Sequence, residues 1–236
     1  MTATPPGTPS ATGRRVLAAD LADTLRQAID ETVCTEAPTA DLAAALASAR
    51  ELLTRLRGHR RPDRQLASLD ERGEGARFHS PASGRGNPLA PPLRIRVVDG
   101  GVEAVAALGR AYEGPPGYVH GGVTALLMDE VLGRAAVEAG RYGVTADLTL
   151  RYRRPVPLRT PVLLTARVRE THGRRTTVTG RVVAAGDPDI PLVEADGLFM
   201  QLTHDTRQTY FGELLAPDGT SAVGYRIHRS RSGQED

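Results

Sequence analysis

Asp129 and the pair Gly121–Gly122 are the residues of this sequence whose types and spacing suit a chemical reaction. An apolar stretch of helical character begins at the two glycines. The first turn of a helix carries unpaired N–H groups and a partial positive charge, so these amides can hold an oxygen on which negative charge develops. Glycine also lets a substrate approach the backbone closely. We therefore predict an oxyanion-binding helix start, the alternative being a corner that only shapes the chain.

Asp129 is the candidate acid–base group. On a helix it shares a face with apolar or small residues, which make up the rest of the stripe: Gly122, Ala125, Leu126, Leu132, Gly133 and Ala136. Burial among such residues would make a carboxylate basic enough to activate water. A structural aspartate bonded to nearby backbone is the alternative. Its neighbour Glu130 is expected to pair with Arg134 one turn later, as on a solvated helix surface.

The spacing of these groups predicts an assembly. Gly121 and Asp129 lie about 12 Å apart along one helix, because each residue rises about 1.5 Å. One small carbonyl group cannot contact both within a single chain. If both act on the same bond, Gly121 comes from one chain and Asp129 from another, so we expect a homodimer with two shared sites.

The His120-Gly121-Gly122 motif, with Asp129 nine residues after the histidine, resembles the hotdog-fold acyl-CoA thioesterases of the phenylacetate pathway and of the mammalian thioesterase superfamily. The run from Thr145 to Leu158 resembles the strand that follows the helix in that family, and the resemblance covers about residues 93–203. It implies hydrolysis of an acyl-CoA to acid and CoA, with Asp129 as general base or nucleophile and the Gly121 amide polarising the carbonyl. It also implies homodimers or dimers of dimers. No cofactor is expected beyond coenzyme A as part of the substrate.

The resemblance implies further roles. His120 would hold the loop or approach the thioester, the alternative being a histidine satisfied by backbone. Thr145 would orient the attacking water, the alternative being an ordinary strand threonine. One subgroup of the family has an asparagine six residues before the histidine, where this chain has Gly114. The residues expected to bind substrate, with the arginines contacting CoA phosphates, are Gly122, Asp147, Arg151, Arg153, Arg154, Arg174 and Arg175. The alternative for each arginine is an ordinary solvated surface residue.

The elements that must position these residues indicate an α+β, hotdog fold: an antiparallel sheet around one long central helix, with an added N-terminal helical region. Helices are expected over 14–32, 41–57 and 122–139. Alternating strands are expected over 93–98, 102–108, 144–152, 162–169, 176–184 and 192–202, with a two-residue turn at Asp99-Gly100. The predicted division of the chain is a disordered tail (1–12), a helical extension and loop (13–92), the hotdog domain (93–203) and a partly mobile C-terminal extension (204–236).

Composition narrows the class of protein. A net charge of +2 and 4% aromatic residues do not suit a nucleic-acid binder. No apolar run approaches the ~18 residues of a membrane span, and residues 1–12 do not resemble a targeting signal. No metal is expected, because no paired Cys/His spacing occurs, and no Gly-x-Ser-x-Gly elbow indicates a serine hydrolase. We expect a cytoplasmic protein that binds neither nucleic acid nor membrane.

Two other functions stay open at this point. One is a non-catalytic hotdog protein that binds acyl-CoA, with the N-terminal residues recruiting a partner. The other is a hotdog dehydratase of the fatty-acid or polyketide type, which the spacing of the His-Gly-Gly motif and Asp129 disfavours.

Overall fold

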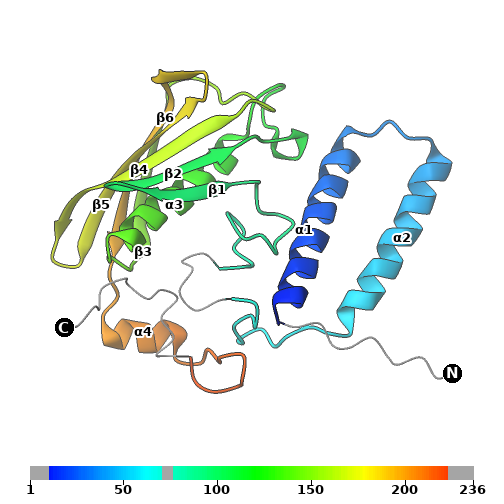
Figure 1. The fold of residues 1–236 in the computed structure, drawn as a ribbon, viewed down its shortest axis with the longest axis horizontal. Helices are drawn as coiled ribbons and strands as arrows, with labels where there is room; N and C mark the ends of the chain where they lie inside the picture. Colours follow the sequence, from blue (N-terminus) through cyan, green and yellow to red (C-terminus); the bar gives the residue numbers. More distant parts are fainter. Residues whose placement is uncertain (1–10, 71–76, 223–236) are drawn as a thin grey trace.

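The protein combines a single antiparallel sheet with one central helix and a separate helical hairpin (Figure 1). Its computed structural model describes residues 11–70 and 77–222. Most of the predicted tail over residues 1–12, and residues 223–236 of the predicted C-terminal extension, lie outside that range. The helices are α1 (Ala11–Cys34), α2 (Thr39–Arg57), α3 (Gly121–Glu138) and α4 (His204–Phe211), with a 3-10 turn η1 (Arg110–Tyr112).

Six strands form the sheet in the order β1-β2-β4-β5-β6-β3, and every neighbouring pair is antiparallel. Their bounds are β1 Arg94–Val98, β2 Gly101–Ala106, β3 Val144–Tyr152, β4 Val162–His172, β5 Arg175–Ala184 and β6 Asp187–Met200. The predicted Asp99-Gly100 turn joins β1 to β2, and Gly100 adopts the positive φ of 72° that such turns require. The last strand begins earlier than predicted, at Asp187. Strand β3, which follows the central helix, lies at one edge of the sheet.

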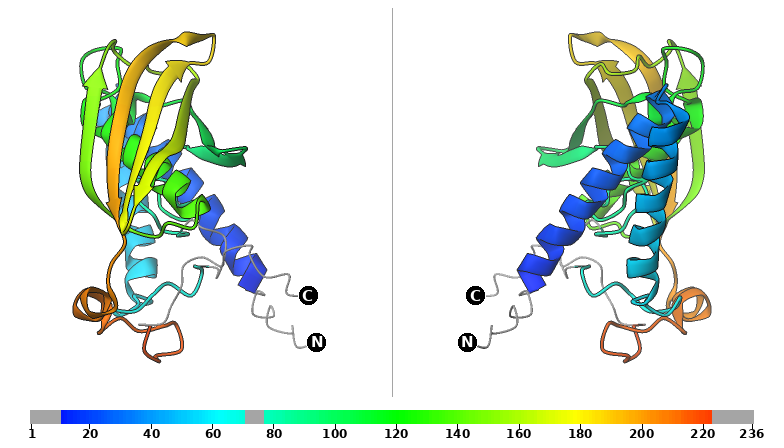
Figure 2. Two further views of the ribbon diagram at one scale, coloured as in Figure 1. Left: turned by 90° about the vertical axis from the view of Figure 1, so that its left-hand side faces the viewer. Right: turned by 90° about the vertical axis from the view of Figure 1, so that its right-hand side faces the viewer.

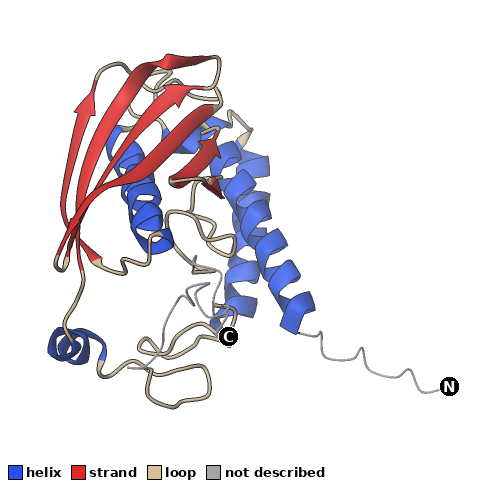
Figure 3. Ribbon diagram, turned by 60° about the vertical axis from the view of Figure 1, so that its left-hand side comes forward, coloured by secondary structure: helices blue, strands red, loops and turns tan. Residues whose placement is uncertain are grey.

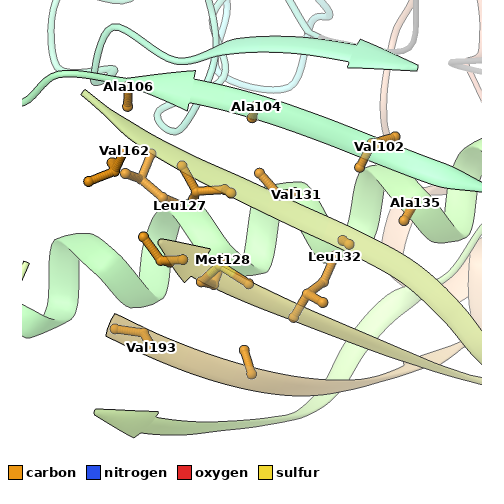
Figure 4. Packing of buried hydrophobic residues seen from close by; sticks show 14 of the residues in the cluster. Val102, Ala104, Ala106, Leu127, Met128, Val131, Leu132, Ala135, Val162 and Val193 are labelled. Carbon is orange, nitrogen blue, oxygen red and sulfur yellow. The ribbon is translucent and has the colours of Figure 1, made fainter. Parts of the chain in front are cut away.

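Helix α3 lies against one face of this sheet and forms the centre of the core (Figures 3 and 4). Met128, Val131 and Leu132 are fully buried between the helix and the strands. Burying each such side chain contributes about 1.5–3 kcal/mol. Gly180 of β5 permits this close packing, because a Cβ there would lie only 2.8 Å from the Met128 Cε atom. The resulting architecture, a sheet curved around one long helix, is the α+β fold predicted from sequence.

The N-terminal hairpin of α1 and α2 stands beside the body of the protein (Figures 1 and 2). Helix α1 is attached through polar bonds to the backbone of the body: the Arg26 guanidinium donates to the carbonyl oxygens of Ala90 (2.7 Å) and Asn87 (3.0 Å). The Asp30 carboxylate accepts from the Ala111 N–H at 2.9 Å. By contrast, α2 has no buried residue. Within the described ranges, none of the helices is long and apolar enough to span a bilayer.

Helix α4 was not predicted. Its side chains are mostly polar and no residue in it is buried, so it lacks the apolar periodicity by which a helix is detected in sequence. Thr203 caps the start of the helix, because its hydroxyl oxygen accepts a hydrogen bond from the Thr206 N–H at 3.2 Å.

Candidate active site

His120 caps the start of α3. Its backbone is extended (φ −60°, ψ 133°), and its Nδ1 accepts a 3.0 Å hydrogen bond from the Gly122 N–H. The His120 N–H donates to the Tyr112 carbonyl oxygen at 2.9 Å, which ties the cap to η1. Because Nδ1 serves as an acceptor, the neutral imidazole carries its proton on Nε2.

The cap leaves one amide of the first turn available. The Gly122 N–H is used by the His120 side chain, and the N–H groups of Val123 and Thr124 donate to the His120 carbonyl oxygen. Among the described residues, no group accepts from the Gly121 N–H. Of the two predicted oxyanion donors, Gly121 is therefore the one that can bind an external oxygen, and Gly122 holds the cap together.

A cleft of about 370 Å³ opens at this helix start. The residues that line it come from the loop before α3, from α3 and from the end of β3; among them are Tyr118, Gly121, Thr124, Tyr152 and Arg154. Gly121, whose amide remains available, thus lines a hollow large enough for part of a ligand.

Tyr152 is a cleft residue whose role sequence patterning did not reveal, because its place in the strand alternation marked it only as a core position. Its hydroxyl donates a 2.8 Å hydrogen bond to the Gly121 carbonyl oxygen. Burial raises the pKa of the Tyr152 phenol. The contact fixes the backbone of Gly121 from the side of the sheet.

Asp129 and Thr145 come together. The Thr145 hydroxyl donates to the Asp129 Oδ1 at 2.8 Å, which joins the middle of α3 to the start of β3. Strict alternation would place Thr145 on the face opposite Leu148. A β-bulge between Thr145 and Asp147 shifts the register, and Thr145 pairs with the buried Phe199 on the helix side of the sheet.

The predicted burial of the Asp129 stripe holds only in part for the single chain, because Leu132 and Ala136 are buried but the rest of the stripe is not. Asp129 is half-buried, and Leu126 on the same stripe is 37% exposed. The face that the helix turns to the sheet overlaps the stripe at Leu132 and Ala136 and otherwise lies beside it. It comprises Thr124, Leu127, Met128, Val131, Leu132, Ala135 and Ala136. The reason is that α3 is apolar around most of its circumference, so the sheet could cover either face. The uncovered face carries the candidate carboxylate.

The expected Glu130–Arg134 pair does not form. Glu130 accepts hydrogen bonds from the hydroxyls of Ser80 and Ser83, while Arg134 pairs with Glu138 at 2.8 Å. Glu130 therefore anchors the loop before β1 to the helix. Its carboxylate is engaged by protein donors, whereas Asp129 accepts from Thr145 alone among the described side chains.

The predicted phosphate-binding arginines separate into two groups. Arg151 and Arg153 form 2.8 Å ion pairs with Asp196 and Glu194 of β6. The hydrogen bond and charge of Asp196 raise the pKa of the Arg151 guanidinium. Arg154, one residue further on, lines the cleft and has no acidic partner within the described residues.

The remaining candidates lie elsewhere. Asp147 lies on the outer face of β3, where it accepts a 3.4 Å hydrogen bond from the Thr149 hydroxyl. Arg174 and Arg175 lie at the β4–β5 turn, next to Met200 in the ladder. Val144 also pairs with Met200, so these two arginines belong to the start of β3 rather than to its cleft end at Tyr152. In the described parts of the chain no group of three or more His, Cys, Asp or Glu side chains is arranged to hold a metal.

Comparisons with known proteins agree with this architecture. Residues 116–190 match the profile of the thioesterase superfamily. The crystal structure of a thioesterase superfamily protein is 34% identical, with 84% of this chain and 97% of that chain covered and a TM-score of 0.69. This chain therefore belongs to the thioesterase superfamily and has its hotdog fold.

Curated relatives match over a shorter stretch. The acyl-coenzyme A thioesterase THEM4 of Xenopus laevis is 36% identical over 90 residues, and that of Mus musculus is 31% identical over 90 residues. The match covers 38% of this chain in both cases, and 40% and 38% of those relatives. The stretch that matches the superfamily profile, residues 116–190, includes α3 and thus the segment that carries Gly121 and Asp129.

Proposed function

We propose that the protein is an acyl-CoA thioesterase in which Asp129 and the Gly121 amide act on the same thioester. The observation that carries the proposal is the 2.8 Å hydrogen bond between the Thr145 hydroxyl and the Asp129 carboxylate on the uncovered face of α3. A carboxylate on a helix that otherwise presents apolar residues, held by a single hydroxyl, has a second oxygen available for water. The curated relatives named as acyl-CoA thioesterases support the same activity.

The reaction follows from these groups. Asp129 takes a proton from a water molecule that Thr145 helps to orient, and the resulting hydroxide adds to the thioester carbonyl carbon. The carbonyl oxygen becomes negative and is held by the Gly121 N–H. The tetrahedral intermediate then collapses, the C–S bond breaks, and Asp129 returns its proton to the thiolate, which leaves as CoA. In the other route the Asp129 carboxylate attacks the carbonyl carbon itself, and the C–S bond breaks so that the CoA thiolate leaves. Water then hydrolyses the resulting anhydride to the free acid and the Asp129 carboxylate.

Two copies of the chain are needed to complete the site. Asp129 lies next to the start of β3, through Thr145, whereas Gly121 lies next to its end, through Tyr152. Strand β3 is an edge strand with one uncovered side. If the β3 strands of two copies pair antiparallel about a two-fold axis, the start of one strand meets the end of the other. Asp129 of each copy is then directed to the Gly121 amide of its partner, and two equivalent sites result.

The same arrangement assigns a role in substrate binding to the arginines near the two ends of β3. Arg154 lies in the cleft at the end of β3, and Arg174 and Arg175 lie near the start of the strand. Antiparallel pairing brings these two ends together from different copies, which makes a basic rim around the pocket opening. Guanidinium groups bind phosphate in a two-pronged manner, so this rim would hold the pyrophosphate or the 3′-phosphate of coenzyme A.

The first experiment measures release of free thiol from a panel of acyl-CoA substrates, short to long and aliphatic to aromatic. Turnover of any of them well above the uncatalysed rate supports the hydrolase. Tight binding of acyl-CoA without thiol release would instead assign a binding protein. Hydration of an enoyl thioester in place of thiol release would assign a dehydratase.

The second experiment mixes two inactive variants and tests the shared site. Gly121→Pro removes the amide proton while keeping a residue that suits the first position of a helix, and Asp129→Asn removes the base. In a mixed dimer one site has both natural residues and the other has neither, so unfolding and refolding the two together should restore about a quarter of the natural activity. If Gly121 and Asp129 of one chain made the site, the mixture would stay inactive.

A further inference from the structure

Helix α2 presents a row of leucines to solvent. Leu42, Leu46, Leu53 and Leu56 are 49%, 50%, 46% and 46% exposed, and no residue of the helix is buried. A surface helix of a small protein normally buries its apolar face against the body. Within the described residues, nothing covers this row.

The spacing of the row is that of a helix–helix contact. With Ala49 included, the apolar positions 42, 46, 49, 53 and 56 follow one another at alternating intervals of four and three residues. That repeat, which averages 3.5 residues, keeps one narrow stripe facing a second helix. A helix that packs on a sheet or a globular core needs a broader stripe. The pattern therefore specifies a single helix as the occupant.

Charge selects the identity and the direction of that helix. The start of α2 carries Asp41, and its end carries Arg55 and Arg57. A second α2 running in the opposite direction would bring Asp41 next to Arg55 of the other copy, and it would oppose the two helix dipoles. A parallel pair would place arginines against arginines. The apolar side chains also match in an antiparallel pair. Leu42 then faces Leu53 of the second copy, and the smaller Ala49 faces Leu46 of the second copy.

We propose that α2 pairs antiparallel with α2 of a second copy of this chain, so that the N-terminal hairpin is an oligomerisation element. The hairpin lies on the opposite side of the molecule from the sheet (Figure 1), so this contact does not compete with a pairing of β3 strands. Together, the two contacts make a dimer of dimers. The α2 contact is independent of the catalytic proposal, because none of its residues belongs to the cleft or contacts Asp129.

The test is the mass of the full-length chain in solution, measured by sedimentation equilibrium over a range of concentrations. Leu46→Glu/Leu53→Glu should halve the mass of the assembly and raise the dissociation constant of the α2 contact at least about a hundredfold. The control Ala47→Glu/Thr54→Glu adds the same charges at the same seven-residue spacing on the outer side of the helix, and it should leave the mass unchanged. Thiol release per chain should persist in both.

Cross-linking with a short bis-maleimide tests whether the two α2 helices run antiparallel or parallel. In a Cys34→Ser background, Ala49→Cys lies in the leucine row near the centre of an antiparallel pair and should link two copies. Arg57→Cys places its two thiols about 28 Å apart along the axis and should not. Efficient linkage at both positions would indicate a parallel pair. An assembly whose mass is unaffected by Leu46→Glu/Leu53→Glu would show that the row contacts something other than a second copy, and would overturn the proposal.

Discussion

Thr145 donates a hydrogen bond to Asp129 across the boundary between β3 and α3, and a β-bulge makes this contact possible. Without the bulge Thr145 would lie on the outer face of the sheet with Asp147 and Thr149. With the bulge, the Thr145 hydroxyl points toward the helix. The ordinary alternation of the strand resumes at Asp147. Bulges commonly redirect a side chain next to a functional site. Here the bulge places the Thr145 hydroxyl so that it holds one oxygen of the Asp129 carboxylate and leaves the other oxygen free.

We expect Thr145→Val to lower kcat without a comparable change in KM. Valine keeps the shape and removes the hydroxyl that orients the Asp129 carboxylate. A hydrogen bond to a charged group contributes about 1.5–3 kcal/mol, so kcat should fall about 10- to 100-fold. Thr145→Ser should restore most of the rate. Thr149→Val, on the outer face of the same strand, is the matched control, and an equal loss in that variant would remove Thr145 from its role.

Asp129→Asn tests the base. Asparagine still accepts a hydrogen bond from Thr145 but cannot take a proton from water, so turnover should fall about 10²- to 10⁴-fold while the thermal unfolding midpoint stays within a few degrees. Glu130→Gln is the matched control, since it neutralises the adjacent carboxylate, which binds Ser80 and Ser83. Its rate should stay close to that of the natural chain. Retention of most activity by Asp129→Asn would contradict the mechanism.

Local patterns in the sequence were sufficient to predict several features of the fold and the site. The helix after Gly121, the Asp99-Gly100 turn and the strand from Val144 to Tyr152 all depend on residues close together in the chain. The carboxylate on α3 followed from its spacing to the glycines. These features are set by backbone preferences and by short-range periodicity, which a sequence displays directly.

Other features depend on contacts between distant residues and were missed. The buried face of α3 was predicted only in part, at Leu132 and Ala136, because the helix is apolar on several sides and only the sheet decides which side is covered. The bulge at Thr145 arises from pairing with Phe199 in a strand far along the chain. Arg151 and Asp196 are likewise brought together by the ladder, so sequence alone could not separate paired arginines from Arg154.

Gly121→Pro tests the amide that we assign to the carbonyl oxygen. Proline suits the first position of a helix, and His120 before it already has an extended backbone that tolerates a following proline. Loss of the N–H should lower kcat about 10²- to 10³-fold, as for removal of one oxyanion donor. Gly121→Ala keeps the amide, and its Cβ would meet Tyr152 at ordinary contact distances of 3.4–3.6 Å. Alanine should therefore retain most of the rate, and equal losses in both variants would indicate crowding instead.

Tyr152 should titrate above the usual phenol value of about 10, because burial raises its pKa. The neutral phenol is the form favoured by folding, so its contribution to stability is complete below pH 10 and is lost as pH rises through the raised value. Tyr152→Phe should lower stability by at most about 1 kcal/mol at neutral pH, since the bond to Gly121 is partly exposed. The difference should vanish at strongly alkaline pH. Absorbance at 295 nm follows the ionisation, and Tyr118→Phe in the same cleft is the control.

Arg154 is expected to bind the nucleotide part of coenzyme A. Arg154→Ala should raise KM for an acyl-CoA about tenfold with little change in kcat, because a phosphate contact is equally strong before and during the reaction. The N-acetylcysteamine thioester of the same acyl group has no phosphate, so the variant and the natural chain should hydrolyse it at the same rate. Arg153→Ala should have a smaller effect on acyl-CoA, since Arg153 is already paired with Glu194. If Arg154→Ala slowed both substrates equally, the residue would support the structure of the cleft and would not bind phosphate.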